Sequence, residues 1–338
     1  MMELTVATLA ATEVLAARVA RSLFARRTLI YVASSRQVTT PADGVLVIRV
    51  LGAGGSGATA SWYAQQKETD RHGATGGSAG TVGMRCVPVK KGDVFTAVLG
   101  AGGESVITQG SPGRDGGATT VTGPGVNIHV PGASGGITGA QAGQQNAPTP
   151  APQGLDWHLA SARNTLKNGR ATGGAAAGIL AGGASHAAQS ENGAGVGNGG
   201  SETELGTAGQ LPGLTLLGEL VNNPRAMRPA DNSYCLLLAP TDGADHYNGD
   251  KDNNYRNKSM GGGNGGYKEN NTNSTAFDGG FGAGGGAAYQ RCGIAGAGGT
   301  GGGGGAVCAN VTYARPDAYK SGKGGDAFAV FEFLEAQP

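Results

Sequence analysis

Two serines stand where a hydrolytic nucleophile could be. Residues 76–80 and 132–136 both fit the pattern G-x-S-x-G, in which a serine on a sharp turn attacks a carbonyl carbon, and these serines are Ser78 and Ser134. Such a serine needs a histidine base that a carboxylate orients, but the five histidines lie in unrelated segments. With 66 glycines among 338 residues, these flanks are also expected by chance. The sequence therefore predicts that the protein is not an enzyme.

A second pattern, G-x-G-x-x-G at residues 52–57, follows an apolar run, as a dinucleotide-binding turn does. That turn must open a helix whose N-terminus holds the pyrophosphate. Residues 58–75 are polar and lack the apolar stripe of such a helix, and the related turn at Gly100 lacks one too. We therefore expect no nucleotide cofactor.

Metal sites are not expected either. Residues 250–254 begin like a calcium loop with alternating oxygen side chains, but Tyr255 replaces the required glycine and Gly261 replaces the bidentate glutamate. The four cysteines form no C-x-x-C pair, which favours free buried thiols over a zinc site. They are Cys86, Cys235, Cys292 and Cys308.

The polar region 241–275 has the composition of a binding loop. Tyr247, Tyr255 and Tyr267 stand among Asn, Asp, Gly and Ser, a mixture of amphipathic rings and adaptable hydrogen-bonding groups. Sugar rings could stack on the tyrosines while the amides and carboxylates bond hydroxyl groups. The alternative is a disordered excursion on the surface.

Charge and hydropathy exclude other classes of partner. Twenty-five basic and 24 acidic residues give a net charge of +1, which argues against nucleic-acid binding. No apolar run approaches the roughly 18 residues of a membrane span, so no membrane insertion is expected. Glu3 and Glu13 interrupt the opening segment, so it is not expected to be a signal peptide.

The elements around these residues are mostly short strands. One helix is predicted over residues 3–27, which are almost free of Gly and Pro and place apolar residues at helical spacing. Residues 1–36 are therefore expected to be an N-terminal helical arm for docking or oligomerisation, ending in a β-prone piece at 28–32. The expected strands lie at 45–51, 82–89, 94–99, 121–130 and 327–333.

Many of the glycines recur at every third position. The longest such series is Gly293, Gly296, Gly299, Gly302 and Gly305. Three residues per turn is the repeat of the polyproline II helix, and glycine on its faces allows neighbouring backbones to approach closely. This series is therefore expected to form a continuous rod in a core made of backbone. The alternative is that these segments are flexible linkers.

The order of motifs resembles the glycine-rich domain of bacteriophage tail fibre and minor tail proteins. T-P-A-D-G at 40–44 leads into an apolar run and G-A-G-G, then G-G-S-A-G follows, then K-G-D at 91–93 before a second apolar run and G-A-G-G. The closing G-G-F-G-A-G at 279–284 and G-G-D at 324–326 agree as well. The resemblance covers about residues 37–334, with an insertion at about 139–275.

This resemblance implies a mainly β fold with polyglycine II-like segments in a domain spanning 37–338. It implies a non-enzymatic virion protein of the tail fibre or tail-tip type, assembled in the host cytoplasm. We expect a homo-oligomer that joins other virion proteins through its arm and contacts a host surface glycan or protein. The alternative is a purely architectural component, such as a head fibre or decoration protein.

Overall fold

The structure is a computed structural model. It describes residues 24–62, 73–141, 143–166, 171–175, 177, 276, 278–279, 282, 284–290, 293–310 and 319–336. These residues form 14 β-strands and no helix, which confirms the expectation of a mainly β fold. Within this part of the chain, no helix is long and apolar enough to span a membrane.

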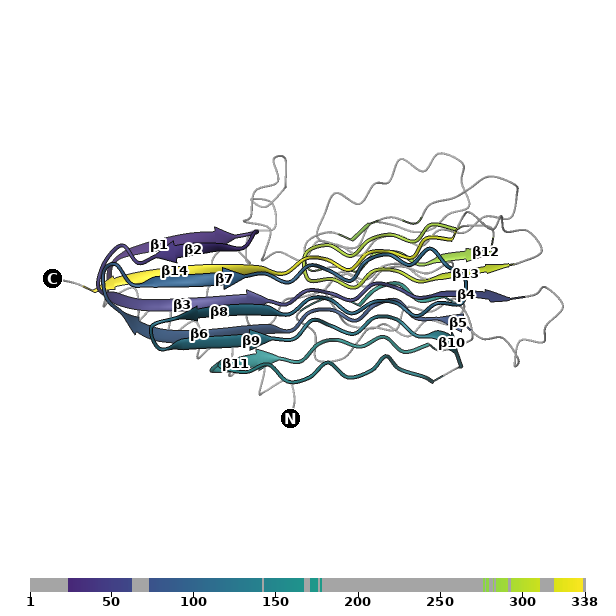
Figure 1. The fold of residues 1–338 in the computed structure, drawn as a ribbon, viewed down its shortest axis with the longest axis horizontal. Coiled ribbons are helices and arrows are strands. Elements are labelled where there is room, and N and C mark those ends of the chain that lie inside the picture. The colour runs from purple at the N-terminus through teal and green to yellow at the C-terminus, as the bar shows by residue number, and fades with distance from the viewer. Residues whose placement is uncertain are drawn as a thin grey trace, which may run out of the picture.

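One end of the molecule is a sandwich of two sheets (Figure 1). The first sheet is antiparallel, with Phe24 opposite Ala336 at its outer end. Its strands are, in spatial order, β1 (Phe24–Val32), β14 (Phe328–Ala336), β3 (Gly44–Leu51), β6 (Val82–Val89) and β11 (Trp157–Leu159). The first and last described strands are therefore neighbours, so both ends of the described chain stabilise the same sheet.

The second sheet is also antiparallel and packs its apolar face on the first. Its strands are, in order, β2 (Arg36–Thr39), β7 (Val94–Val98), β8 (Thr119–Gly123) and β9 (Val126–Val130). The period of two is clear in β9, which buries Val126, Ile128 and Val130 and exposes the residues between them. Phe95 of β7 and Phe331 of β14 meet in the core with their ring centroids 6.4 Å apart.

The other end is built from extended glycine-rich chain. Stretches at residues 52–58, 75–81, 100–117, 131–137, 295–306 and 321–327 run side by side as wavy lines in Figure 1, and we call them the glycine segments. The short strands at this end are β4 (Thr59–Trp62), β5 (Gly73–Ala74), β10 (Thr138–Ala140), β12 (Ala288–Gln290) and β13 (Val307–Asn310). The segments 52–58, 75–81 and 131–137 connect β4, β5 and β10 to the sandwich. Small residues fill the interior here, and one cluster consists of six alanines and Cys308.

The structure corrects the boundary of the predicted arm. Residues 24–27, expected as the end of a helix, begin β1, and the expected β-prone piece at 28–32 completes that strand. Backbone pairing with β14 overrides the local helix propensity of these residues, as tertiary pairing commonly does. Residues 24–36 therefore belong to the sandwich rather than to a separate arm, while residues 1–23 lie outside the described residues.

Most of the expected strands are found at their expected places. β6 coincides with 82–89, β3 and β7 match 45–51 and 94–99 closely, and β14 contains 327–333 apart from its first residue. The run 121–130, expected as one strand, is instead a hairpin of β8 and β9, because Gly125 adopts a φ of 68° in the turn between them. The expected insertion also begins inside the fold, since it supplies β11.

Candidate functional site

The glycine segments are joined by backbone hydrogen bonds that repeat every three residues. Along residues 52–59, successive amides donate to three different neighbours in turn, at 2.8 to 3.1 Å. Gly52, Gly55 and Ala58 donate to residues 81, 78 and 75; Gly54 and Gly57 donate to residues 325 and 322; and Ser56 and Thr59 donate to residues 114 and 111. This segment is therefore surrounded by neighbours on three sides, with its backbone polar groups satisfied by other backbone groups.

The close approach of these segments requires glycine at specific positions. A Cβ atom added at Gly54, Gly57 or Gly80 would lie 1.8 to 2.0 Å from a carbonyl oxygen of another segment. Real side chains do not approach an oxygen so closely, and the obstacle is backbone, which cannot rotate away. At such distances the Cα–H groups face neighbouring carbonyl oxygens, which adds weak hydrogen bonds to the N–H···O network.

The predicted glycine series is placed differently from expectation. Residues 293–305 do not form one rod, because the chain reverses at Thr300 and Gly301, where Gly301 has a φ of 71°. The amide of Gly302 donates to the Gly299 carbonyl and that of Gly305 donates to the Gly296 carbonyl, as in a hairpin. A Cβ at Gly305 would lie 2.0 Å from the Gly286 carbonyl oxygen, so this member of the series does need to be glycine.

The two serines of the G-x-S-x-G patterns meet inside the glycine end. Their hydroxyl oxygens are 2.9 Å apart, and both residues are buried. Asn146 Nδ2 donates to the Ser78 hydroxyl, and the Ser134 hydroxyl donates to the Ala147 carbonyl at 2.7 Å. Because the one hydroxyl proton of Ser134 is already donated to the Ala147 carbonyl, the Ser78 hydroxyl must donate to the Ser134 oxygen. Each hydroxyl thus donates once and accepts within a fixed chain, so the pair has a structural use.

Asparagine side chains complete this buried polar cluster, and the sequence analysis did not single them out. Asn146 Nδ2 also donates to the Gly76 carbonyl, and Asn164 Nδ2 donates to the carbonyls of Gly77 and Gly173, at 2.8 to 2.9 Å. The two amides therefore add side-chain hydrogen bonds to glycine carbonyls inside the bundle of segments. Both asparagines stand in ordinary polar stretches, so no local pattern marks them.

Five of the six amides in the G-x-G-x-x-G pattern, all but that of Ala53, already donate to backbone carbonyls within the fold. The amides of Gly54, Ser56 and Gly57 donate to backbone carbonyls of other segments, and β4 rather than a helix follows the pattern. A pyrophosphate site needs free amides at the start of a helix. The glycines here serve packing between segments.

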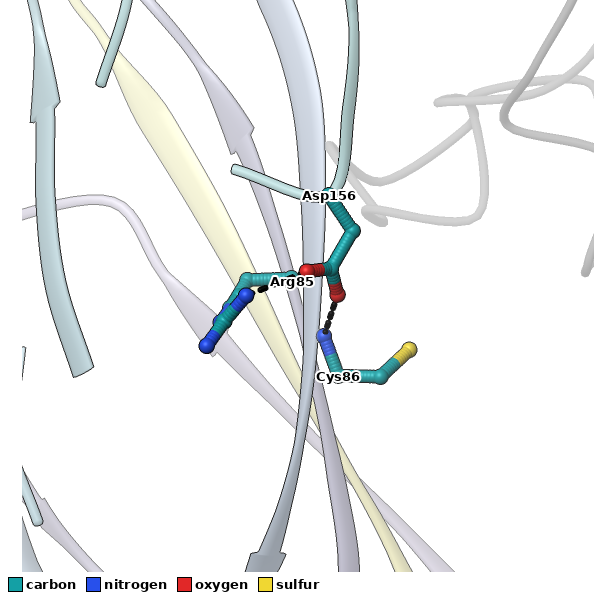
Figure 2. Close-up of polar contacts among 3 residues, drawn as sticks. All are labelled: Arg85, Cys86 and Asp156. Atoms are coloured by element: carbon teal, nitrogen blue, oxygen red, sulfur yellow. Dashed lines mark hydrogen bonds and ion pairs between the residues drawn. The ribbon is translucent and has the colours of Figure 1, made fainter. Parts of the chain in front are cut away.

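Arg85, Cys86 and Asp156 make the clearest polar cluster on the sandwich (Figure 2). The Asp156 carboxylate accepts from the Arg85 guanidinium and, at 2.7 Å, from the Cys86 amide, and the Asp156 amide donates to the Met84 carbonyl. These bonds fasten the start of β11 to β6. Both charged side chains are about one third exposed, so the ion pair itself contributes little, on the order of 0–1 kcal/mol.

The Cys86 thiol lacks the features of a reactive nucleophile. Burial around the sulfur raises its pKa, and the negative charge of Asp156 raises the pKa further. A nucleophilic cysteine needs the opposite shift, because the thiolate is the reactive form. Of the cysteines expected to be buried, Cys308 is buried, whereas Cys86 is exposed as a whole residue although its sulfur is partly desolvated. Neither of these two cysteines is in a disulfide.

Several residues considered in the sequence analysis, including the expected receptor-binding tyrosines, fall outside the described residues. They are Tyr247, Tyr255 and Tyr267 of the expected binding loop, with Cys235, Cys292, His72, His186 and His246. The two described histidines, His129 and His158, lie on β9 and β11 in different sheets. Among the described residues, no three His, Cys, Asp or Glu side chains are grouped as metal ligands would be.

No family model matches the chain, and no curated protein matches it significantly.

Proposed function

We propose that this chain is a non-enzymatic bacteriophage virion protein of the tail fibre or tail-tip type, whose glycine segments are polyglycine II helices. The observation that carries the proposal is the period of three in the hydrogen bonds of residues 52–59. In a helix with three residues per turn, successive amides point about 120° apart, so each segment bonds three neighbours. A bundle of this kind is stiff without a large apolar core, which suits a fibre or adhesin that must hold a binding surface away from the particle.

The motif order along the chain supports the same proposal. The G-A-G-G sequences at 52–55 and 100–103 each follow a strand of the sandwich, β3 and β7, as the resemblance to phage tail proteins implies. The G-x-S-x-G and G-x-G-x-x-G patterns are used within the backbone core, so the proposed role needs no chemistry at these residues. Host contact is assigned to the loop 241–275, through a surface glycan or protein.

The position in the particle provides the first test. Antibody-labelled virions imaged by electron microscopy should carry the label on the tail or at its tip. A label on the head surface would contradict the tail assignment and favour the architectural alternative.

Adsorption to host cells provides the second test. Virions in which Tyr247, Tyr255 and Tyr267 are all replaced by Ala should assemble normally but adsorb at least tenfold more slowly, because aromatic rings supply much of the energy of such contacts. The matched control replaces the same three residues by Phe and should retain much of the adsorption, since the rings remain. Normal adsorption of the Ala variant would place the receptor contact elsewhere.

A further inference from the structure

The outer face of the five-stranded sheet, which points away from the second sheet, carries a buried track. Alternate residues of β3 and β14 form it, and their exposed fractions are only 2–5%. They are Val47, Arg49, Leu51, Phe328, Val330 and Glu332. On the strands to either side, Tyr31 of β1 and Met84 of β6 are half-buried and Cys86 is exposed. The side chains on this face are therefore buried most deeply along β14 and β3.

No described strand lies on this face, because the second sheet packs on the opposite one. Among the described residues, Gly301 lies against Leu51 at the end of the track next to the glycine segments, where an added Cβ would be 2.5 Å from the Leu51 side chain. Two adjacent strands span about 10 Å with their side chains, and an α-helix is about 10–12 Å in diameter. The width of the buried track therefore fits one helix laid along β3 and β14.

The track contains a guanidinium that is only partly satisfied. Arg49 Nη1 donates to Glu332 Oε2 at 2.7 Å, and both side chains are almost fully buried. The Nε and Nη2 atoms of Arg49 are buried without a hydrogen-bond partner. A buried unpaired donor is costly, and a charged one more so, which calls for an acceptor from whatever covers the face.

The segment directly before β1 has the matching pattern. Residues 3–23 are expected to be helical, and their apolar stripe is Val6, Leu9, Ala16, Ala20 and Leu23. The gap of seven between Leu9 and Ala16 contains Glu13, which completes the spacing 3, 4, 3, 4, 3. An acidic residue thus stands in the middle of the apolar stripe, so a surface that covers the stripe must supply hydrogen-bond donors to its carboxylate.

The register brings this carboxylate to the level of the ion pair. Phe24 is opposite Ala336; Glu332 lies four residues further along β14, about 13 Å away, and Val330, which is paired with Arg49, lies six residues further, about 20 Å away. A helix that runs back from Leu23 over the sheet places Glu13 ten residues away, about 15 Å at 1.5 Å per residue. These positions agree to within the reach of the side chains. Helix 3–23 would also be about 32 Å long, close to the roughly 30 Å of the nine-residue strand β14.

We propose that residues 3–23 form an amphipathic helix that covers the outer face of the five-stranded sheet in the same chain, with the Glu13 carboxylate accepting from Nε and Nη2 of Arg49. The apolar stripe is then part of the protein's own core and is not free to dock on other virion proteins. This inference stands independently of the proposed function.

Cross-linking tests the position of the segment. In the full chain, Ala16→Cys should be joined to Cys86, which lies on the same sheet face, by a short bismaleimide. The control Ala11→Cys, on the opposite side of the helix, should be joined much less. Mixing ¹⁴N- and ¹⁵N-labelled protein and identifying the linked peptides by mass spectrometry should show links within one chain only. Links between chains would overturn the proposal, because the segment would then cover the sheet of a second copy. The absence of a link at Ala16→Cys would overturn it as well, because the segment would not lie on this sheet face.

A double-mutant cycle tests the proposed pair. Glu13→Gln should lower the folding equilibrium constant about tenfold, whereas Glu3→Gln, near the start of the segment, should change it less than about twofold. In the Arg49→Met background the effect of Glu13→Gln should largely disappear. Equal effects in both backgrounds would overturn the pairing, and the cross-link result stands even if Arg49→Met fails to fold.

Discussion

At the scale of single residues, the serines and the cysteine that could act as nucleophiles are held by their surroundings. Ser78 and Ser134 each donate one hydrogen bond in a chain that runs from the Asn146 amide to the Ala147 carbonyl. Cys86 is held as a thiol by burial and by Asp156. Stability and ionisation measurements at these residues therefore test the hydrogen bonds and burial that the structure shows.

Ser78→Ala should lower the free energy of unfolding by about 1–3 kcal/mol, because it removes the acceptor of Asn146 and the donor to Ser134 in a buried site. Ser134→Ala should cost a similar amount, and the double variant should cost less than the sum, since the two changes break one shared bond. Urea unfolding measures these values, with the exposed Ser34→Ala as control. Stoichiometric labelling of Ser78 by a fluorophosphonate would contradict a structural role.

Alkylation of Cys86 should require a higher pH than alkylation of a free cysteine. Because the folded pKa is raised, the thiolate forms only above the ordinary thiol range, and ionisation there favours the unfolded chain. Stability should therefore fall as the pH rises through that range. Asp156→Asn should shift the rate profile of the Cys86 peptide, followed by mass spectrometry, toward lower pH. An unchanged profile would mean that Asp156 does not contribute to the raised pKa.

At the scale of elements, the glycine segments differ from strands in what determines their packing. A strand of the sandwich presents two faces, and its side chains decide which of them is buried. A glycine segment presents its backbone to its neighbours, so the presence or absence of a Cβ atom decides the contact. Adjacent residues of one segment can therefore differ sharply in their tolerance of substitution.

Gly102→Val and Ala101→Val should differ clearly in their effect on the free energy of unfolding. A Cβ at Gly102 would lie 1.8 Å from the Gly324 carbonyl oxygen, whereas the neighbouring Ala101 already carries a Cβ and is exposed. Gly102→Val should cost more than about 3 kcal/mol or prevent folding, and Ala101→Val should stay within about 0.5 kcal/mol. Thermal and urea unfolding measure both variants. Equal tolerance would show that this segment is a flexible linker.

At the scale of the whole molecule, the sandwich and the glycine end share their chain. β3 runs directly into residues 52–58, residues 75–81 run into β6, and residues 321–327 run into β14. Figure 1 shows these connections continuing straight from the strands into the wavy segments. Loss of order at one end should therefore remove support at the other.

The two tryptophans can test this coupling. Trp62 lies on β4 at the glycine end and Trp157 on β11 in the sandwich, so Trp157→Phe and Trp62→Phe leave one fluorescent reporter at each end. Unfolding curves from the two variants, each compared with its own circular dichroism curve, should coincide, as a two-state transition requires. Separate midpoints by fluorescence and circular dichroism would show two independently stable units.

The sequence by itself determined most strands of the sandwich and the mainly β class of the fold. Runs such as 82–89 alternate or cluster apolar β-branched residues strongly enough to be found from local pattern alone. The period of three among the glycines also pointed to extended segments packed through their backbones. These features are local, so the residues that carry them are adjacent in the chain.

Only the tertiary structure decided which segments meet and what each glycine contacts. The series from Gly293 to Gly305 reads as one rod, but the φ of Gly301 turns it into a hairpin, and glycine allows both equally. Residues 24–27 suit a helix locally and become a strand because β14, from the far end of the sequence, supplies their partners. Ser78 and Ser134, which are 56 positions apart, meet because segments from different parts of the chain lie side by side. These outcomes depend on long-range contacts, which local spacing does not encode.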